Sequence, residues 1–230
     1  MNHYTYIKRN LDAVTASLAD AAARSGYPTP ELVAVTKSAS PEQVLALAEL
    51  SVPCMAENRV QLLRERKELL AGRGQCFDLI GSLQTNKVKH VVGEVRLIQS
   101  LDSLHLAAEI NRISEKRGVV TSVLVEINSA REQAKGGVLP EQAEAFVSAL
   151  SDYPAIRVLG LMTMGPASRD PSALRACFRE TRALFVRLLE AGAFASDTPV
   201  LSMGMSESYL IAAEEGATMV RVGRALFTPS

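Results

Sequence analysis

The sequence lacks several features that point to particular classes of protein. It has no tryptophan, only three cysteines and three histidines among 230 residues, and no net charge, since 25 acidic side chains balance 25 basic ones. Balanced charge gives no general attraction to nucleic acid or to an anionic membrane surface. The cysteines, at positions 54, 76 and 177, are odd in number and show no C-x-x-C spacing. That usage argues against a disulfide framework and is typical of thiols buried in a reducing compartment.

Long hydrophobic runs are also absent. The first ten residues, MNHYTYIKRN, contain no apolar signal-peptide core, and no stretch has the length of a membrane-spanning helix. His3, His90 and His105 all fall in helical stretches, and no His/Cys/Asp cluster has the spacing of metal ligands. The sequence therefore predicts a cytoplasmic protein with no metal site and no membrane partner.

Hydrophobic residues are plentiful and make up 47% of the sequence. A chain of this length and composition can bury a large core, and its size is that of one barrel domain. No Pro/Gly/Ser-rich linker or low-complexity insert divides it. We therefore expect a single domain over residues 1–230.

Short apolar runs alternate eight times with amphipathic stretches. A helix is predicted first, because apolar residues recur at helical spacing from Tyr4 to Ala21, before Gly26 and Pro28. The predicted strands are 32–36, 52–56, 77–81, 95–100, 119–128, 156–162, 199–202 and 217–223. The predicted helices that separate them lie near 41–50, 58–71, 84–92, 103–117, 140–151, 171–191 and 206–215.

This alternation predicts an α/β fold with a parallel sheet. Continuous apolar strands separated by helices are typical of parallel strands that are covered on a face. Eight such units favour a closed (β/α)8 (TIM) barrel with an extra N-terminal helix. The alternative is an open doubly wound sheet, but the G-x-G-x-x-G fingerprint that would favour it does not follow the first strand.

Chemistry in such a barrel lies at the carboxyl ends of the strands, where this sequence places Lys37. Lys37 directly follows the predicted strand 32–36, so its side chain would emerge at the barrel mouth. A lysine in a low-dielectric pocket loses its charge more readily and becomes a nucleophile for carbonyl groups. Position alone is equally consistent with a lysine that extends into solvent at a strand end.

The loops after the seventh and eighth predicted strands are the second candidate. Phosphate groups commonly bind there in this fold, at the start of a short extra helix. Ser202, Gly204 and Ser206 offer hydroxyl groups and close backbone approach, and Gly223 leads into a possible helical turn, RALF. The alternative is that these are tight turns that merely need glycine.

Arg221 is the third candidate, because it lies two residues before Gly223 and so on the same face of the eighth strand. A cation inside a barrel mouth needs a partner. That partner is either a bound ligand or a buried carboxylate.

Several motifs resemble those of a known family. The matching segments are LVAVTKSASPEQV, AENRVQ, FDLIGSLQTNKVKHVV, IQSLDS, VEINSAREQAKGGV, IRVLGLMTM, LSMGMSES and ATMVRVGRALF. They occur in the family's order and span Leu32 to Phe227. On these segments the sequence resembles the pyridoxal-phosphate homeostasis proteins of the YggS/PROSC type. Their barrel is similar to the N-terminal domain of alanine racemase.

The resemblance implies a site for pyridoxal 5′-phosphate (PLP). In it Lys37 is the Schiff-base lysine, and Arg221 faces the pyridine nitrogen and keeps it unprotonated, which weakens the ring as an electron sink. Phosphate contacts would come from Ser202, Gly204, Ser206, Gly223 and Arg224, and the pocket would be lined by Asn58, Ser100 and Met162. Asn86 and Asn128 match the family pattern without an assigned contact.

The sequence also departs from the family pattern. The usual Trp-His before the third strand's Phe-Ile-Gly is here Phe77-Asp78, and the usual Gly-Glu-Asn is Ala56-Glu57-Asn58. Arg224 replaces the common threonine after Gly223, and Thr228 replaces a common glycine. An arginine at 224 either gives an ionic phosphate contact or points to solvent.

Three functions remain open from the sequence. The first is a protein that binds and hands over PLP without turnover; the second is a PLP-dependent amino-acid racemase; the third is a Schiff-base aldolase. Racemisation needs acid/base groups on both faces of the α-carbon. In alanine racemase the opposite tyrosine comes from a second domain and a partner subunit, and we expect no such domain here. Tyr209 lies near the strand-seven loop but follows no predicted strand directly.

The aldolase hypothesis ranks third, because its lysine has no carboxylate base nearby except Glu57. The first hypothesis leads. The resemblance then implies a cytoplasmic protein that affects vitamin B6 balance and delivers PLP to PLP-dependent apoenzymes. Without the racemase's second domain, we expect a monomer.

Overall fold

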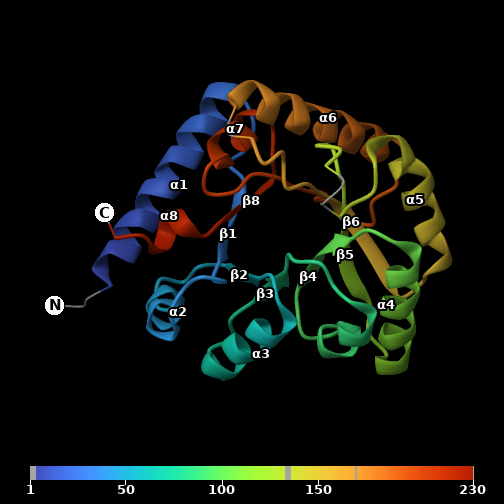
Figure 1. Cartoon of the computed structure of the whole chain (residues 1–230), viewed down its shortest axis with the longest axis horizontal. Coiled ribbons are helices and arrows are strands. Elements are labelled where there is room, and N and C mark those ends of the chain that lie inside the picture. The colour runs from blue at the N-terminus through green and yellow to red at the C-terminus, as the bar shows by residue number, and fades with distance from the viewer. Residues whose placement is uncertain (1–3, 133–135, 169, 230) are drawn as a thin grey trace.

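The computed structural model describes residues 4–132, 136–168 and 170–229. Eight parallel strands close into a barrel in chain order, with β8 pairing back to β1 (Figure 1). The strands are β1 (Glu31–Val35), β2 (Cys54–Glu57), β3 (Phe77–Leu79), β4 (Leu97–Leu101), β5 (Thr121–Glu126), β6 (Ile156–Met162), β7 (Val200–Ser202) and β8 (Met219–Val222). The predicted (β/α)8 barrel is confirmed.

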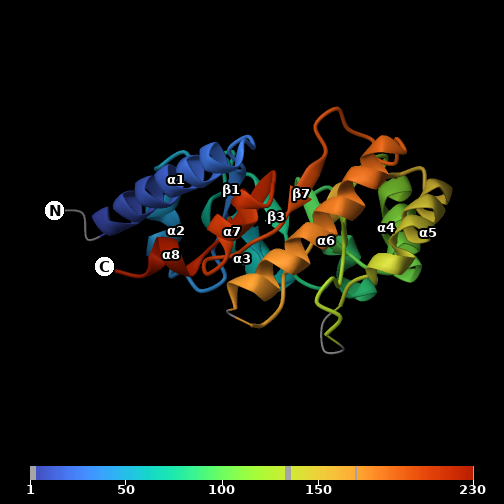
Figure 2. The same ribbon diagram turned by 90° about the horizontal axis from the view of Figure 1, so that it is seen from above.

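Helices surround the strands (Figures 1 and 2). The α-helices are α1 (Thr5–Ser25), α2 (Pro41–Ala48), α3 (Val60–Leu69), α4 (Leu104–Arg117), α5 (Ala143–Ala149), α6 (Pro171–Glu190), α7 (Tyr209–Glu214) and α8 (Arg224–Phe227). Three short 3-10 helices are η1 (Thr85–His90), η2 (Pro140–Gln142) and η3 (Leu150–Asp152).

The extra N-terminal helix α1 precedes the first strand, as predicted. Its buried residues Ile7, Val14 and Leu18 lie on the predicted apolar stripe. It runs beside α7 and α8 (Figure 2), and the Asn10 side chain donates hydrogen bonds to the backbone carbonyls of Leu226 and Thr228. These contacts join the first helix of the chain to the last.

Three helix predictions need correction. The predicted helix 140–151 is α-helical only over α5, and the 3-10 helices η2 and η3 form its two ends. The segment 84–92 forms the 3-10 helix η1, whose bonds close over three residues, as from Lys87 N to Gln84 O. Only Val88 within η1 is buried, so one apolar contact does not supply the stripe that stabilises an α-helix. The predicted helix 206–215 begins only at Tyr209, because residues 203–208 form the loop after β7.

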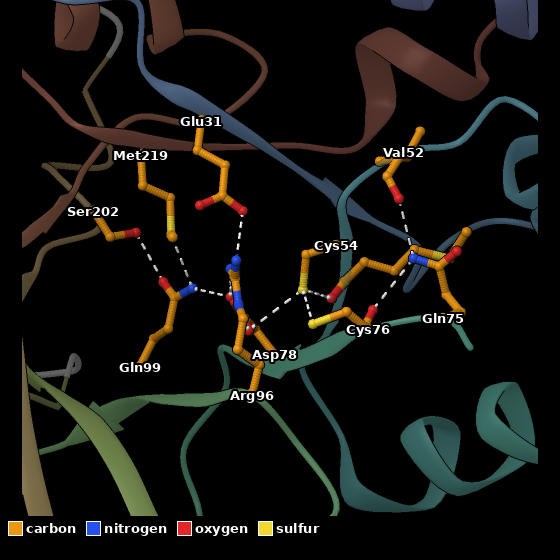
Figure 3. A network of polar contacts seen from close by, with 11 residues as sticks. Glu31, Val52, Cys54, Gln75, Cys76, Asp78, Arg96, Gln99, Ser202 and Met219 are labelled. Carbon is orange, nitrogen blue, oxygen red and sulfur yellow. Dashed lines mark hydrogen bonds and ion pairs between the residues drawn. The ribbon is translucent and has the colours of Figure 1, made fainter. Parts of the chain in front are cut away.

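A line of polar side chains crosses the barrel interior. Arg221 on β8 donates to Ser202 Oγ at 2.6 Å, and Ser202 donates to Gln99 Oε1 at 2.8 Å. Gln99 donates in turn to Asp78 Oδ2 at 2.8 Å, and Asp78 receives the guanidinium of Arg96 at 2.7 and 2.9 Å (Figure 3). Buried polar groups are costly when they are unpaired. These hydrogen bonds therefore hold the buried guanidinium of Arg221 and the buried carboxylate of Asp78 in place.

No helix in the described part of the chain is both long and apolar enough to cross a membrane.

Gly160 on β6 allows close packing against β7. A Cβ at this position would lie 1.9 Å from the carbonyl oxygen of Val200, and Gly160 has a φ of +154°. We expect Gly160→Ala to lower the free energy of unfolding by about 3 kcal/mol or more. Gly192→Ala is the matched control, because Gly192 has a φ of +68° but no atom within 4 Å of the added carbon. It should cost about 1 kcal/mol. Equal losses in urea unfolding would show that close packing at Gly160 is unimportant.

Candidate functional site

A cavity of about 350 Å³ opens at the carboxyl ends of the strands. Its wall comes from the segments that follow β1, β3, β6, β7 and β8, together with parts of α2, α6 and α8. The predicted site residues that line it are Lys37, Ser206, Arg221, Gly223 and Arg224. Three segments that are far apart in the sequence, at residues 37, 206 and 221–224, thus meet at one opening, in the place that the barrel fold predicts.

Lys37 lies in the turn that follows β1, and its side chain reaches the cavity. The residue is exposed, so the low-dielectric surroundings expected for it are not present. The reason is local: β1 ends at Val35, and the chain turns outward before Lys37. The amine can reach a molecule in the cavity and remains open to water.

Glu57, the carboxylate considered as a base for Lys37, does not line the cavity. It is fully buried, accepts a hydrogen bond from Thr36 Oγ1, and has Arg66 Nε 3.7 Å from its Oε1. Burial raises the pKa of Glu57, although the contacts with Thr36 and Arg66 oppose that shift. Because Glu57 is not part of the cavity wall, it is poorly placed as a base for chemistry at Lys37.

Arg221 is a buried cation whose hydrogen-bond partners in the described structure are neutral. Its Nη1 donates to Ser202 and its Nη2 donates to the carbonyl of Thr163 at 2.9 Å. Burial lowers the pKa of Arg221 to about 10, with partial compensation from the charge of Glu126. No described carboxylate lies within ion-pair distance of it, and the buried carboxylate whose charge acts on it from farther away is Glu126. The guanidinium instead forms part of the cavity wall.

The loops after β7 and β8 are joined through the Ser206 hydroxyl. Its Oγ accepts hydrogen bonds from the backbone N–H groups of Gly223 at 3.1 Å and Ala225 at 3.4 Å. The sequence RALF forms the short helix α8, as expected. Arg224 Nη2 pairs with Glu207 Oε1 at 2.9 Å, and both side chains are exposed at the cavity rim.

The other predicted site residues lie behind the wall. Ser202 supports Arg221, and Gly204, with a φ of +86°, accepts the backbone N–H of Arg221 at 3.1 Å. Met162 is fully buried in the barrel interior. Ser100 Oγ donates to the carbonyl of Gly81 at 2.7 Å.

Gly81 and Asn58 approach one another closely at the barrel mouth. A Cβ on Gly81 would lie 2.1 Å from the carbonyl oxygen of Asn58. The residue Asn58 is half-buried. Asn128, left without an assigned contact, bonds through its side-chain amide to the backbone of Glu132 and so shapes the loop after β5. Asn86 is exposed on η1.

Sequence reasoning missed Gln99 and Glu126. Gln99 lies inside an apolar strand, and the signal that could have revealed it is the polar pair Gln99-Ser100 interrupting the run VRLIQS. Glu126 ends β5 and is 6% exposed, and burial raises its pKa to about 7. The charge of Asp102 raises this pKa further and that of Arg221 lowers it. A carboxylate that ends an otherwise apolar strand could have been recognised as a mouth residue.

No metal site is expected, because no His, Cys and Asp residues have ligand spacing in the sequence, but the fold does bring one such group together. Cys54 Sγ, Cys76 Sγ and an oxygen of Asp78 all lie within 4.8 Å of one another. Their separation in sequence hides this, because it is the pairing of β2 with β3 that brings them together. Cys76 is also half-buried rather than part of the core. His90 and His105 lie in η1 and α4, as expected, and His3 lies outside the described residues.

Few groups on the cavity wall could serve as a second acid or base. Within the described residues the wall includes no histidine or tyrosine, and its one carboxylate is the exposed Glu207. Tyr209 begins α7 and packs against the hydrophobic core. The described cavity wall therefore offers no histidine or tyrosine that could act as an acid opposite Lys37.

Glu126 makes stability depend on pH. Its pKa in the folded protein is about 7, against 4.5 for an ordinary glutamate. Its contribution to stability is therefore fully present below pH 4.5 and is lost as pH rises through 7. The free energy of unfolding of Glu126→Gln minus that of the parent protein should be about 3 kcal/mol larger at pH 8 than at pH 4.

Urea unfolding at both pH values measures that difference. Glu115→Gln, an exposed position on α4, is the control and should leave the pH dependence unchanged. An unchanged pH dependence in Glu126→Gln would show that the carboxyl is ordinary.

Comparison with known proteins places this cavity in context. The family model described as "Alanine racemase, N-terminal domain" matches residues 9–230. A pyridoxal phosphate homeostasis protein of Aquifex aeolicus is 40% identical over 197 residues, which are 86% of each chain. One from Helicobacter pylori is 34% identical over 223 residues, covering 96% of this chain and 97% of the relative.

A solved structure is similar over nearly the whole chain. PipY of Synechococcus elongatus PCC7942, in its structure with PLP bound, superposes with a TM-score of 0.79 at 28% identity, covering 94% of this chain and all of PipY. The relatives, the family model and the closed barrel agree with the resemblance carried by the sequence motifs. The chain belongs to the pyridoxal phosphate homeostasis protein family, which has the fold of the alanine racemase N-terminal domain.

Proposed function

We propose that this protein binds PLP in the cavity at the barrel mouth, attached to Lys37 as a Schiff base, and serves PLP homeostasis without turning over a substrate. The observation that carries the proposal is the meeting of Lys37, Arg221 and the Ser206–Gly223 loop around one cavity. These groups match three parts of PLP that a protein can bind. Lys37 matches the aldehyde, Arg221 the pyridine nitrogen, and the Ser206–Gly223 loop the phosphate. The PLP named in the PipY structure and the names of the relatives support it.

The residues present fit this cofactor. When bound, PLP supplies an aldehyde that condenses with amines and a ring that can withdraw electrons. The Lys37 amine would attach it, and Arg221 would donate a hydrogen bond to the unprotonated ring nitrogen. Because Arg221 has a pKa of about 10, its guanidinium stays protonated near neutral pH. It would therefore be the hydrogen-bond donor, and the ring nitrogen would stay unprotonated as the acceptor.

The phosphate would lie at the loops after β7 and β8. There the Ser206 hydroxyl and the first N–H groups of α8 are already held together by hydrogen bonds. Arg224 would add positive charge at the rim, where Glu207 holds it in place. Ser202 and Gly204 would act from behind the wall by fixing Arg221, and Asn58, Ser100 and Met162 would shape the mouth.

A carrier role fits this geometry better than the racemase alternative. A racemase needs a second acid/base group opposite the lysine, and the described wall offers none of the usual kind. Lys37 lies in the turn after β1 at the cavity mouth, where an incoming amine would reach the attachment point and release PLP.

The remaining elements of the proposal concern the cellular setting. We infer a monomer in the cytoplasm that hands PLP to PLP-dependent apoenzymes. The odd number of cysteines and the lack of C-x-x-C spacing support a reducing compartment.

Attachment at Lys37 can be tested with Lys37→Ala. The parent protein with PLP should show a visible absorption band that borohydride removes while fixing the cofactor to the protein, and Lys37→Ala should show neither change. Lys116→Ala, which removes an exposed lysine of α4, is the control and should behave as the parent. A fixed cofactor in Lys37→Ala would refute attachment at Lys37.

The phosphate site can be tested with Ser206→Ala. Loss of a hydroxyl that holds two N–H groups should weaken PLP binding about 10-fold. Binding of pyridoxal, which has no phosphate, should change by less than about 2-fold. Fluorescence titration of both compounds gives the two ratios. An equal loss for both would mean that Ser206 acts on the fold and not on the phosphate.

A further inference from the structure

At the opposite end of the barrel two thiols lie in contact. Cys54 is the first residue of β2, and Cys76 immediately precedes β3. Their sulfur atoms are 3.2 Å apart (Figure 3). Met55 pairs with Phe77, and the Met55 N–H donates to the Cys76 carbonyl, so the parallel register continues back to the two cysteines. Neighbouring strands lie about 4.8 Å apart, which is within the backbone separation that a disulfide spans.

The two thiols differ in a way that suits oxidation. Cys54 is fully buried, whereas Cys76 is half-buried and reachable by a small molecule. The hydrogen bond from Cys54 lowers the pKa of the Cys76 thiol, against the opposing effect of burial; the charge of Arg96 lowers it further, and those of Asp78 and Glu31 oppose the shift. The same hydrogen bond and burial raise the pKa of Cys54. The thiolate is the reactive form of cysteine, so Cys76 is the thiol that an oxidant meets first. Cys54 is the second thiol, which then attacks the oxidised Cys76 sulfur.

Asp78 completes the cluster, but its carboxylate is already occupied. Its Oδ1 accepts from Arg96 Nε at 2.9 Å and from Cys54 Sγ at 3.4 Å. Its Oδ2 accepts from Arg96 Nη2 at 2.7 Å and from Gln99 Nε2 at 2.8 Å. A metal ion would have to displace a guanidinium that is paired through two hydrogen bonds. The arrangement therefore favours chemistry between the two sulfur atoms over metal binding.

We propose that Cys54 and Cys76 form a peroxide-sensitive dithiol that closes to an intramolecular disulfide. The Cys76 thiolate attacks one peroxide oxygen; the S–O bond forms, the O–O bond breaks, and the released hydroxide takes a proton to become water. Cys54 sulfur then attacks the Cys76 sulfenic acid; the S–S bond forms, the S–O bond breaks, and a second water leaves with the proton of Cys54. Two thiols lose two electrons and two protons to one hydrogen peroxide.

The site is independent of the proposed PLP cavity. Cys54 and Cys76 lie where β2 and β3 begin, whereas Lys37 and Ser206 follow the ends of β1 and β7. The disulfide would link the two ends of the segment that contains α3. Such a cross-link restricts the unfolded chain, so the oxidised protein should melt roughly 5 °C higher than the reduced one.

The test is stoichiometric hydrogen peroxide on the reduced full-length protein, followed by alkylation under denaturing conditions and peptide mass mapping. We expect the alkylatable thiols to fall from three to one, the linked peptides to be those of Cys54 and Cys76, and a thiol reductant to reverse the change. Cys177→Ser is the matched control and should form the same link. Cys54→Ser and Cys76→Ser should not form it.

Three results would overturn the proposal. They are over-oxidation of Cys76 without a link, a link only between two molecules, and persistence of all three thiols. Zn²⁺ alone is a separate probe, in equilibrium dialysis of the reduced protein. Stoichiometric binding that is lost in both serine variants would assign a metal site in place of the dithiol. Because the parent protein carries the main readout, a variant that fails to fold does not leave the question open.

Discussion

The structure depends on a guanidinium enclosed in a barrel of parallel strands. Arg221 is 2% exposed, and a buried charge is tolerated only when its hydrogen-bond donors are satisfied. Ser202 and the Thr163 carbonyl meet that need without neutralising the charge. The site therefore keeps positive charge in the cavity wall, which favours an acceptor atom on a bound molecule.

The same requirement organises the rest of the interior. The Ser202 hydroxyl donates its hydrogen bond to Gln99, so its oxygen is free to accept one from Arg221. Asp78 orients Gln99 in turn, by accepting a hydrogen bond from its amide. Asp78 is itself a buried charge, and Arg96 at the barrel's amino end compensates it. A hydrogen-bonded line thus runs from Arg221 on the cavity wall through Ser202 and Gln99 to Asp78. Figure 3 shows its part from Ser202 to the thiol pair.

The sequence predicts the barrel well because its signals are local and repeated. Apolar runs and helical stripes are read over a few residues, and the buried residues Ile7, Val14 and Leu18 of α1 fall on the predicted stripe. Lys37, Ser206, Arg221 and Gly223 line one cavity because each lies near the carboxyl end of a strand, and strand ends meet in a barrel. What could not be predicted depends on contacts between distant segments. Cys54 and Cys76 meet only through strand pairing, and the exposure of Lys37 depends on where β1 stops.

The central claim is that Lys37 is the attachment point for PLP. The most direct measurement is peptide mapping by mass spectrometry of the PLP-loaded protein after borohydride reduction. The account predicts one pyridoxyl phosphate group per chain, on the peptide that contains Lys37. A group spread over several lysines, or placed on a single lysine other than Lys37, would contradict it.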